Sequence, residues 1–177
     1  MSSSLETFSF IGANNETVWG WHIPPIKRIN QKAPLTFLIH GDPQASCYNS
    51  WSYRWNFHVK VMLLLELIFV VLIHMDKNFT NKLGLNAALN LFNYIDGNRA
   101  IALGASYGGY MIDWIAGHTQ MNQRFQAFVN YHGIFDVRQM VYSTDELWFI
   151  EYDIGQFTQY ENPQAYEIFN PINYISD

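Results

Sequence analysis

The stretch RAIALGASYGGYMIDWIAGH at residues 99–118 constrains the fold more than any other part of the sequence. It begins with a mostly apolar run, continues through Gly104, Ser106 and Gly108, and ends in an apolar segment with helical spacing. A strand, a Gly-Xaa-Ser-Xaa-Gly turn and a helix form a nucleophile elbow, in which the serine has a strained, positive φ. We therefore predict that Ser106 lies at the carboxyl end of a strand as a candidate nucleophile. The alternative is a glycine-rich turn with a passive serine.

Other apolar runs place this elbow in a larger sheet. Predicted strands cover residues 17–23, 35–40, 67–73, 99–105 and 125–133, and predicted helices cover residues 84–95 and 107–118. Strands that alternate with helices are typical of an α/β fold, with a mostly parallel sheet and helices on both faces. Functional residues of such folds gather at the carboxyl ends of the strands, where Ser106 is expected. After residue 133 the chain is rich in aromatic residues and shows no regular pattern.

Composition and charge exclude several classes of protein. Hydrophobic residues make up 49% of the 177-residue chain and charged residues 14%, which predicts one domain with a substantial core. The net charge of −5 argues against nucleic-acid binding. The apolar run at residues 59–73 contains Lys60 and Glu66 and is shorter than the roughly 20 residues of a membrane span. We expect it to be a buried helix that runs into a strand, and we expect no membrane partner and no signal peptide.

The oxyanion of an acyl-transfer reaction needs two hydrogen-bond donors. The backbone amide of Tyr107, directly after the serine, is one candidate. The loop at residues 40–44 follows an earlier central strand and is the candidate for the second, because Gly41 lets the backbone approach a substrate oxygen. We expect His40 to orient this loop rather than to act as a base.

A base and an acid for Ser106 are harder to find. The triad order on this kind of fold is Ser, then Asp or Glu, then His. His118 lies 12 residues further along the predicted helix, about 18 Å away, and is expected to be a surface or capping residue. His132 ends the strand expected beside that of Ser106, and Asp136 follows it, so this pair is the stand-in for base and acid. A strand end gives no reason for the approach of about 3 Å that a base requires, so a structural role for His132 is favoured.

Two further carboxylates follow at Asp145 and Glu146. We interpret them as charges at the N-terminus of a helix, with Ser143 or Thr144 as the cap.

Three stretches resemble a known family: FLIHGDPQASCYNSWSYRWN at residues 37–56, RAIALGASYGGYMIDWIAGH at residues 99–118 and YSTDELWF at residues 142–149. They are similar to the catalytic domain of fungal dipeptidyl-peptidase V, in the prolyl oligopeptidase family of serine peptidases. The resemblance implies an α/β-hydrolase fold, Ser106 as nucleophile, and Tyr107 and the Gly41 loop as oxyanion elements. It also implies a short peptide as substrate, no cofactor, and secretion.

The departures from this family are equally informative. Asp42 stands where the family usually has glycine, and it places a negative charge beside a site meant for an oxyanion. The Gly-rich segment expected after residues 67–73 is missing. We expect a partial α/β-hydrolase domain over residues 1–177, without the family's N-terminal β-propeller and without the last strands, whose loops carry the Asp and the His.

This incompleteness leaves three functional hypotheses. The first is a serine peptidase fragment that is weak or inactive by itself. The second is an esterase of the same fold, and the third is a catalytically silent interaction module or non-functional fragment. An uncovered sheet edge would also invite association with another chain.

Overall fold

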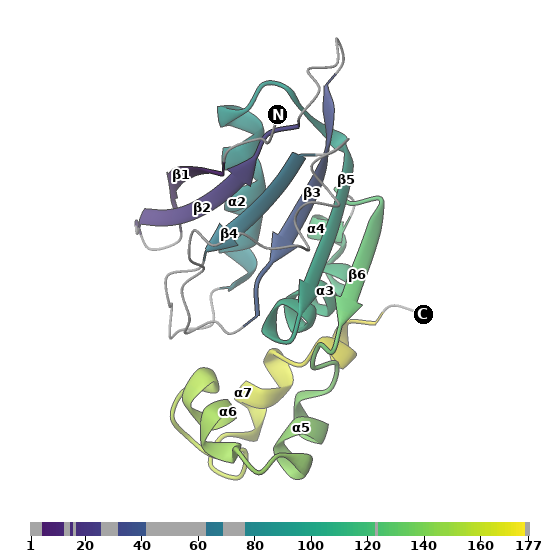
Figure 1. The fold of residues 1–177 in the computed structure, drawn as a ribbon. Coiled ribbons are helices and arrows are strands. Elements are labelled where there is room, and N and C mark those ends of the chain that lie inside the picture. Colours follow the sequence, from purple (N-terminus) through teal and green to yellow (C-terminus); the bar gives the residue numbers. More distant parts are fainter. Residues whose placement is uncertain are drawn as a thin grey trace.

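In the part of the chain that the structure describes, six strands form one mixed sheet (Figure 1). The structure is a computed structural model, and it describes residues 5–12, 15, 17–25, 32–41, 63–68, 77–122 and 124–175. The strand order is β1-β2-β4-β3-β5-β6. The bounds are Glu6–Ile11 for β1, Thr17–Ile23 for β2, Ala33–Ile39 for β3, Leu63–Ile68 for β4, Ile95–Ala105 for β5 and Ala127–Tyr131 for β6.

Strands β4, β3, β5 and β6 run parallel to one another. Strands β1 and β2 form an antiparallel hairpin at one edge, and β2 is antiparallel to β4. Strand β3 lies in the middle of the sheet, and its residues Leu35, Phe37 and Ile39 are fully buried. A strand that has neighbouring strands on both sides and buried side chains has apolar residues at successive positions. This pattern is why the strand could be predicted from the sequence. The mostly parallel sheet is confirmed.

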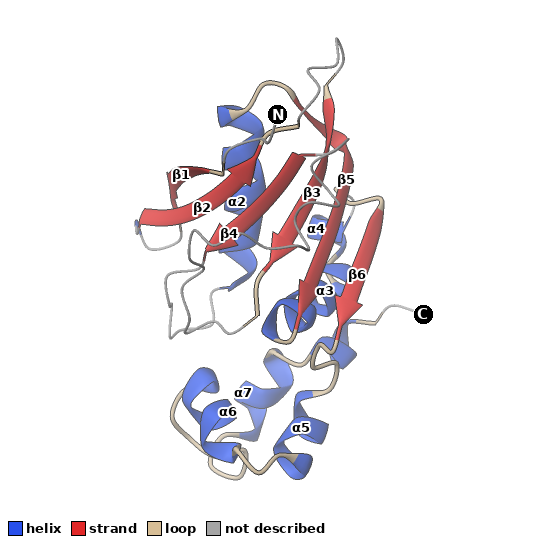
Figure 2. Cartoon of the chain, in the orientation of Figure 1, coloured by secondary structure: helices blue, strands red, loops and turns tan. Residues whose placement is uncertain are grey.

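Helices α2 (Lys77–Leu91), α3 (Tyr107–Gly117) and the short α4 (Thr119–Asn122) lie on one face of this sheet (Figure 2). Helix α3 is apolar almost all round, because it packs against β5 and β6 and is then covered by later residues. Leu85 and Ala88 of α2 join Met111 and Ile115 of α3 in a single hydrophobic core. No helical layer on the opposite face is seen within the described residues, and that part of the fold stays a prediction.

Element boundaries differ from the predicted ones for tertiary reasons. The predicted strand at residues 67–73 is described over Leu63–Ile68, and residues 69–73 lie outside the described part. Strand β5 begins at Ile95 rather than Arg99, because Ile95 pairs with Ala33 before an irregularity in the register. Strand β1 was not predicted.

The region after residue 133 is regular, which corrects the expectation of an irregular end. It forms a helical segment of α5 (Val137–Ser143), α6 (Leu147–Ile154), α7 (Pro163–Ile168) and the 3-10 helix η2 (Pro171–Tyr174). Figure 1 shows α5, α6 and α7 beyond the carboxyl ends of β5 and β6. These helices have only 4 to 8 residues, too few for a clear periodic pattern in the sequence.

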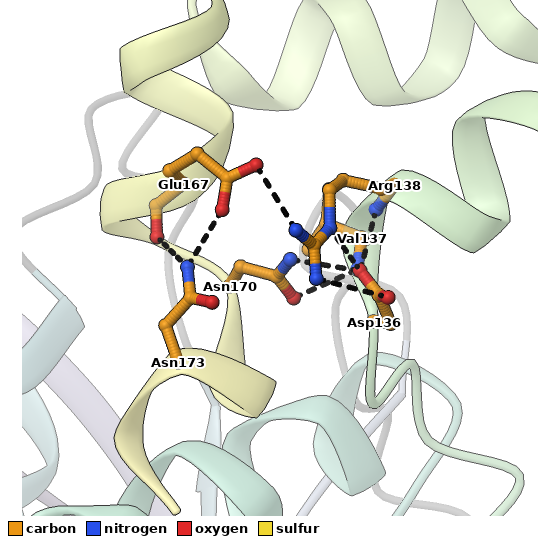
Figure 3. Close-up of polar contacts among 6 residues, drawn as sticks. All are labelled: Asp136, Val137, Arg138, Glu167, Asn170 and Asn173. Atoms are coloured by element: carbon orange, nitrogen blue, oxygen red, sulfur yellow. Dashed lines mark hydrogen bonds and ion pairs between the residues drawn. The ribbon is translucent and has the colours of Figure 1, made fainter.

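A polar network joins the start of the helical segment to its end (Figure 3). Asn170 is completely buried; its Oδ1 accepts from the Val137 amide at 2.9 Å and its Nδ2 donates to Asp136 at 2.8 Å. Arg138 bridges Asp136 and Glu167, with nitrogen–oxygen distances of 3.0 Å and 3.5 Å. A buried amide with both ends bonded fixes one arrangement of the helices.

None of the helices among the described residues has the length and apolar character needed to cross a membrane.

Candidate active site

Ser106 occupies the sharp turn between β5 and α3. Its φ is 55° and its ψ is −122°, so the predicted positive φ is confirmed, and the residue is exposed. Its amide donates to the Tyr131 carbonyl at 3.0 Å, and its own carbonyl accepts from the Tyr110 amide at 3.0 Å. Such a conformation costs about 1–3 kcal/mol and persists only where the surroundings enforce it. Here β6 holds one side of the turn and the first turn of α3 holds the other.

The two glycines of the motif are required by close packing. A Cβ atom on Gly104 would collide with the backbone of Gly108, and one on Gly108 would collide with the carbonyl oxygen of Ile39. Helix α3 therefore starts almost in contact with the ends of β5 and β3.

The described part of the predicted oxyanion loop, His40 and Gly41, lies directly against this turn. A Cβ atom on Gly41 would be 2.9 Å from the Ala105 carbonyl oxygen and 3.2 Å from the Ser106 Cβ. His40 is 9% exposed, and its Nδ1 lies 2.5 Å from the Gly41 carbonyl oxygen. The ring therefore contacts the backbone of the next residue, and its role in orienting the rest of the loop stays a prediction. Asp42 lies outside the described residues.

Tyr107 is the first residue of α3, where the helix directs backbone N–H groups and the positive end of its dipole outward. Burial raises the pKa of its hydroxyl well above the usual value, and the charge of Asp153 adds to this. Tyr110 is also buried, with its pKa raised by burial, and its hydroxyl donates to the Phe169 carbonyl at 2.8 Å. These neutral rings join the elbow helix to the helical segment.

His132 directly follows the residue that bonds the Ser106 amide. It is exposed, has a φ of 54°, and its ring stands edge-on to that of Tyr131, with the ring centres 4.3 Å apart. The Asn130 side chain accepts from the Gly133 amide at 2.8 Å and so closes the turn that contains His132. Within the described residues no side chain hydrogen-bonds the Ser106 hydroxyl, so the role of His132 as a base stays a prediction.

Asp136 has a structural environment. It caps α5 by accepting from the Arg138 amide at 3.0 Å, and it also accepts from the Arg138 guanidinium and from Asn170. The bonds from Arg138 foremost, with that from Asn170, hold the pKa of Asp136 below its usual value. No described hydrogen bond links Asp136 to His132, and both of its oxygens are engaged in the network of Figure 3.

The other polar candidates have mixed outcomes. His118 is the C-cap residue of α3, as expected, and its ring contacts those of Trp114 and Tyr174, with centres 4.3 Å and 4.4 Å away.

The predicted cap at Ser143 or Thr144 is wrong. Ser143 is the last residue of α5 and donates to the Gln139 carbonyl, and Thr144 is the C-cap residue of α5. Glu146 is the N-cap of α6, and Thr144 accepts from its amide at 3.0 Å.

Sequence reasoning missed one close contact of the elbow. A Cβ atom on Gly109 would be 2.5 Å from the Asn130 side-chain oxygen and 2.6 Å from the Gly133 Cα. The second glycine of the Ser-Tyr-Gly-Gly stretch therefore lets α3 touch the turn after β6. The doubled glycine was the available signal.

The sheet, the strained serine and the glycine loop beside it define a partial α/β-hydrolase fold. The model of the prolyl oligopeptidase family matches residues 82–177, which is more than half of the chain. The chain belongs to the prolyl oligopeptidase family.

The chain is similar to dipeptidyl-peptidase 5 of Schizosaccharomyces pombe, with 34% identity over 98% of this chain and 28% of the relative. It is 29% identical to dipeptidyl-peptidase 5 of Porphyromonas gingivalis, over 88% of this chain and 25% of the relative. The chain thus spans about a quarter of the length of these curated relatives.

Solved structures share the fold. An acylaminoacyl peptidase of Pyrococcus horikoshii superposes with a TM-score of 0.84 at 21% identity, over 98% of this chain and 30% of that protein. A puromycin-hydrolyzing peptidase of Mycobacterium tuberculosis gives a TM-score of 0.79 at 18% identity, over 97% of this chain and 29% of that protein.

Proposed function

We propose that this chain is the nucleophile-bearing part of a serine peptidase that acts on short peptides through Ser106. The observation that carries the proposal is the strained, exposed serine at the N-terminus of α3, with Gly41 packed against it. Family membership supports the same chemistry, and the relatives named dipeptidyl-peptidase 5 support a peptide as the substrate.

The proposed reaction is acyl transfer. The Ser106 oxygen bonds to the carbonyl carbon of the substrate and loses its proton, the C–N bond breaks, and the amine leaves with a proton. Water then cleaves the acyl ester and restores the hydroxyl. The amides of Tyr107 and of the Gly41 loop are the proposed oxyanion donors.

Turnover by this chain alone is expected to be slow. No imidazole hydrogen-bonds Ser106 in the part of the chain that the structure describes, and serine without a base is a poor nucleophile at neutral pH. Oxyanion stabilisation and binding alone still give about 10³–10⁴-fold acceleration over water.

A fluorophosphonate probe tests the nucleophile directly. We expect slow labelling: after prolonged incubation, intact-mass analysis of the folded chain should show one added phosphonyl group, mapped to Ser106 and lost in Ser106→Ala. Folded wild-type protein that stays unlabelled would contradict the proposal and favour the silent interaction module.

An esterase is the second candidate, since the described residues bring no acid to protonate an amine leaving group. A phenolate leaves an ester without that proton. Comparing a chromogenic dipeptide anilide with a short acyl phenyl ester, with Ser106→Ala as control, separates the two activities.

Secretion and association complete the proposal. Secretion is supported by the family resemblance, and finding the native protein only inside cells would contradict it.

Association is supported by β6, which pairs with β5 on one side and, in the described sheet, has no strand on the other.

A further inference from the structure

A pocket of about 200 Å³ lies on the outer side of α3, between this helix and η2. It is separate from the elbow and uses none of the proposed catalytic residues. Its lining consists of one carboxylate and mainly apolar groups: Asp113, Ala116, Gly117, Phe135, Pro171, Tyr174 and Ile175.

Among the described residues, the carboxylate of the pocket has no cationic partner. Asp113 is half-buried, and one of its oxygens, Oδ2, accepts from the uncharged Asn130 amide at 2.6 Å. Within the described residues no Lys, Arg or His forms an ion pair with it. Burial raises the pKa of Asp113 above its usual value, with the Asn130 bond acting against this. A half-buried carboxylate in an apolar pocket is stabilised best by a cation that also carries apolar surface to cover the pocket walls.

The part of the pocket wall formed by Gly117 and Tyr174 is firmly placed. A Cβ atom on Gly117 would be 2.8 Å from the Tyr174 Cβ, so η2 is packed onto the last turn of α3. The Tyr174 hydroxyl donates to the Ile168 carbonyl at 2.6 Å, and its ring contacts those of Trp114 and His118. Phe135 and Ile175, in contrast, are 44% and 57% exposed.

We propose that this pocket binds a primary ammonium group carried on a short aliphatic stem. The ammonium ion bonds to the second oxygen of Asp113, and the methylene groups lie against Phe135, Tyr174 and Ile175. An ammonium ion has three donors and a compact charge, and the four-carbon stem of lysine has the length and apolar character of such a ligand. Aromatic rings beside the carboxylate add a favourable contact for the cation.

The experiment uses ¹⁵N-labelled full-length chain and the probe n-pentylammonium, with 1-pentanol as the neutral probe of the same stem. We expect saturable shifts of the Ala116 and Gly117 amides with the amine. The alcohol should bind about tenfold more weakly, because it cannot make the hydrogen bonds of a charged donor to Asp113.

Variants of similar shape isolate the carboxylate. Asp113→Asn should remove the preference for the amine over the alcohol, whereas Asp145→Asn, at an exposed position outside the pocket, should keep it. Ala116→Leu fills the pocket and should abolish binding of both probes, which keeps the test usable if Asp113→Asn does not fold. Absence of saturable shifts at these amides, or an unchanged preference in Asp113→Asn, would overturn the proposal.

Two sources of the ammonium group are then distinguished. Tighter binding of Nα-acetyl-lysine methylamide than of pentylammonium assigns the pocket to a lysine side chain of a polypeptide. The reverse order assigns it to a free aliphatic amine.

Discussion

At the scale of single residues, the elbow depends on glycines, which have no Cβ atom, more than on contacts between side chains. Gly104, Gly108 and Gly41 each occupy a place where a Cβ atom would meet neighbouring backbone. Backbone cannot move aside in the way that the end of a flexible side chain can. Substitutions here therefore test the packing that holds Ser106 in its strained conformation.

Gly108→Ala should destabilise the fold by about 1–3 kcal/mol, because the new methyl group collides with the Ile39 carbonyl. The free energy of urea unfolding measures this change. Gly97→Ala is the matched control, since a Cβ atom there meets only the side chain of Leu89, and its cost should stay below about 1 kcal/mol. Equal effects of the two substitutions would contradict the packing argument.

Asp136→Ala distinguishes a structural from a catalytic carboxylate. Removal of the α5 cap and of the Asn170 partner should cost about 1–3 kcal/mol of unfolding free energy. The rate of fluorophosphonate labelling per folded molecule should not change. Asp145→Ala, at an exposed loop position, should alter neither quantity. Loss of labelling in folded Asp136→Ala would show instead that this carboxylate serves Ser106.

At the scale of elements, the hairpin of β1 and β2 is attached to the end of α2 by a buried histidine. His22 is 4% exposed, lies 3.3 Å from Glu6 through its Nε2, and has its ring centre 4.1 Å from that of Phe92. Its Nδ1 has no described partner. Desolvation lowers the pKa of His22 from its ordinary value of 6.5, although Glu6 acts in the opposite direction. Burial raises the pKa of Tyr94, which follows Phe92 in the turn after α2, and the charge of Glu6 adds to this.

The lowered pKa of His22 predicts a loss of stability in acid. Below pH 6.5 the unfolded chain takes up a proton at His22 that the folded chain does not, so its contribution is present above pH 6.5. As the pH is lowered further, this contribution to the free energy of unfolding falls by up to about 1.4 kcal/mol per pH unit, until the pKa of His22 in the folded chain is reached.

Unfolding free energies at several pH values below 7.5 check this, because His22→Gln should show a smaller decrease than the wild type. His132→Gln, at an exposed histidine, should follow the wild type. A wild-type slope that His22→Gln leaves unchanged would contradict the assignment.

At the scale of the whole molecule, β6 is an edge of the described sheet. Its side chains alternate: Phe128 and Asn130 face α3, whereas Val129 and Tyr131 point to the other face and are 49% and 65% exposed. An apolar edge strand of this kind invites pairing with another chain.

We expect the wild type to associate in a concentration-dependent way in sedimentation velocity. Val129→Lys should shift the equilibrium toward monomer, because a lysine on an edge strand disfavours pairing with an added strand. Ile168→Lys, at a 46% exposed apolar position on α7, should leave association unchanged. A wild type that remains monomeric at all concentrations would refute the association proposed for this edge.

The sequence by itself determined the elbow, the central strands and the place of Ser106, because these depend on short-range patterns. Apolar runs, turn residues and the two glycines that flank Ser106 lie close together in the chain, and their geometry follows from local sterics. Only the tertiary structure decided the role of Asp136, the order of the helical segment, and the pocket at Asp113. These depend on Asn170, Tyr174 and Asn130, which lie 17 to 61 positions from the residues they serve, and no local pattern specifies such distant partners.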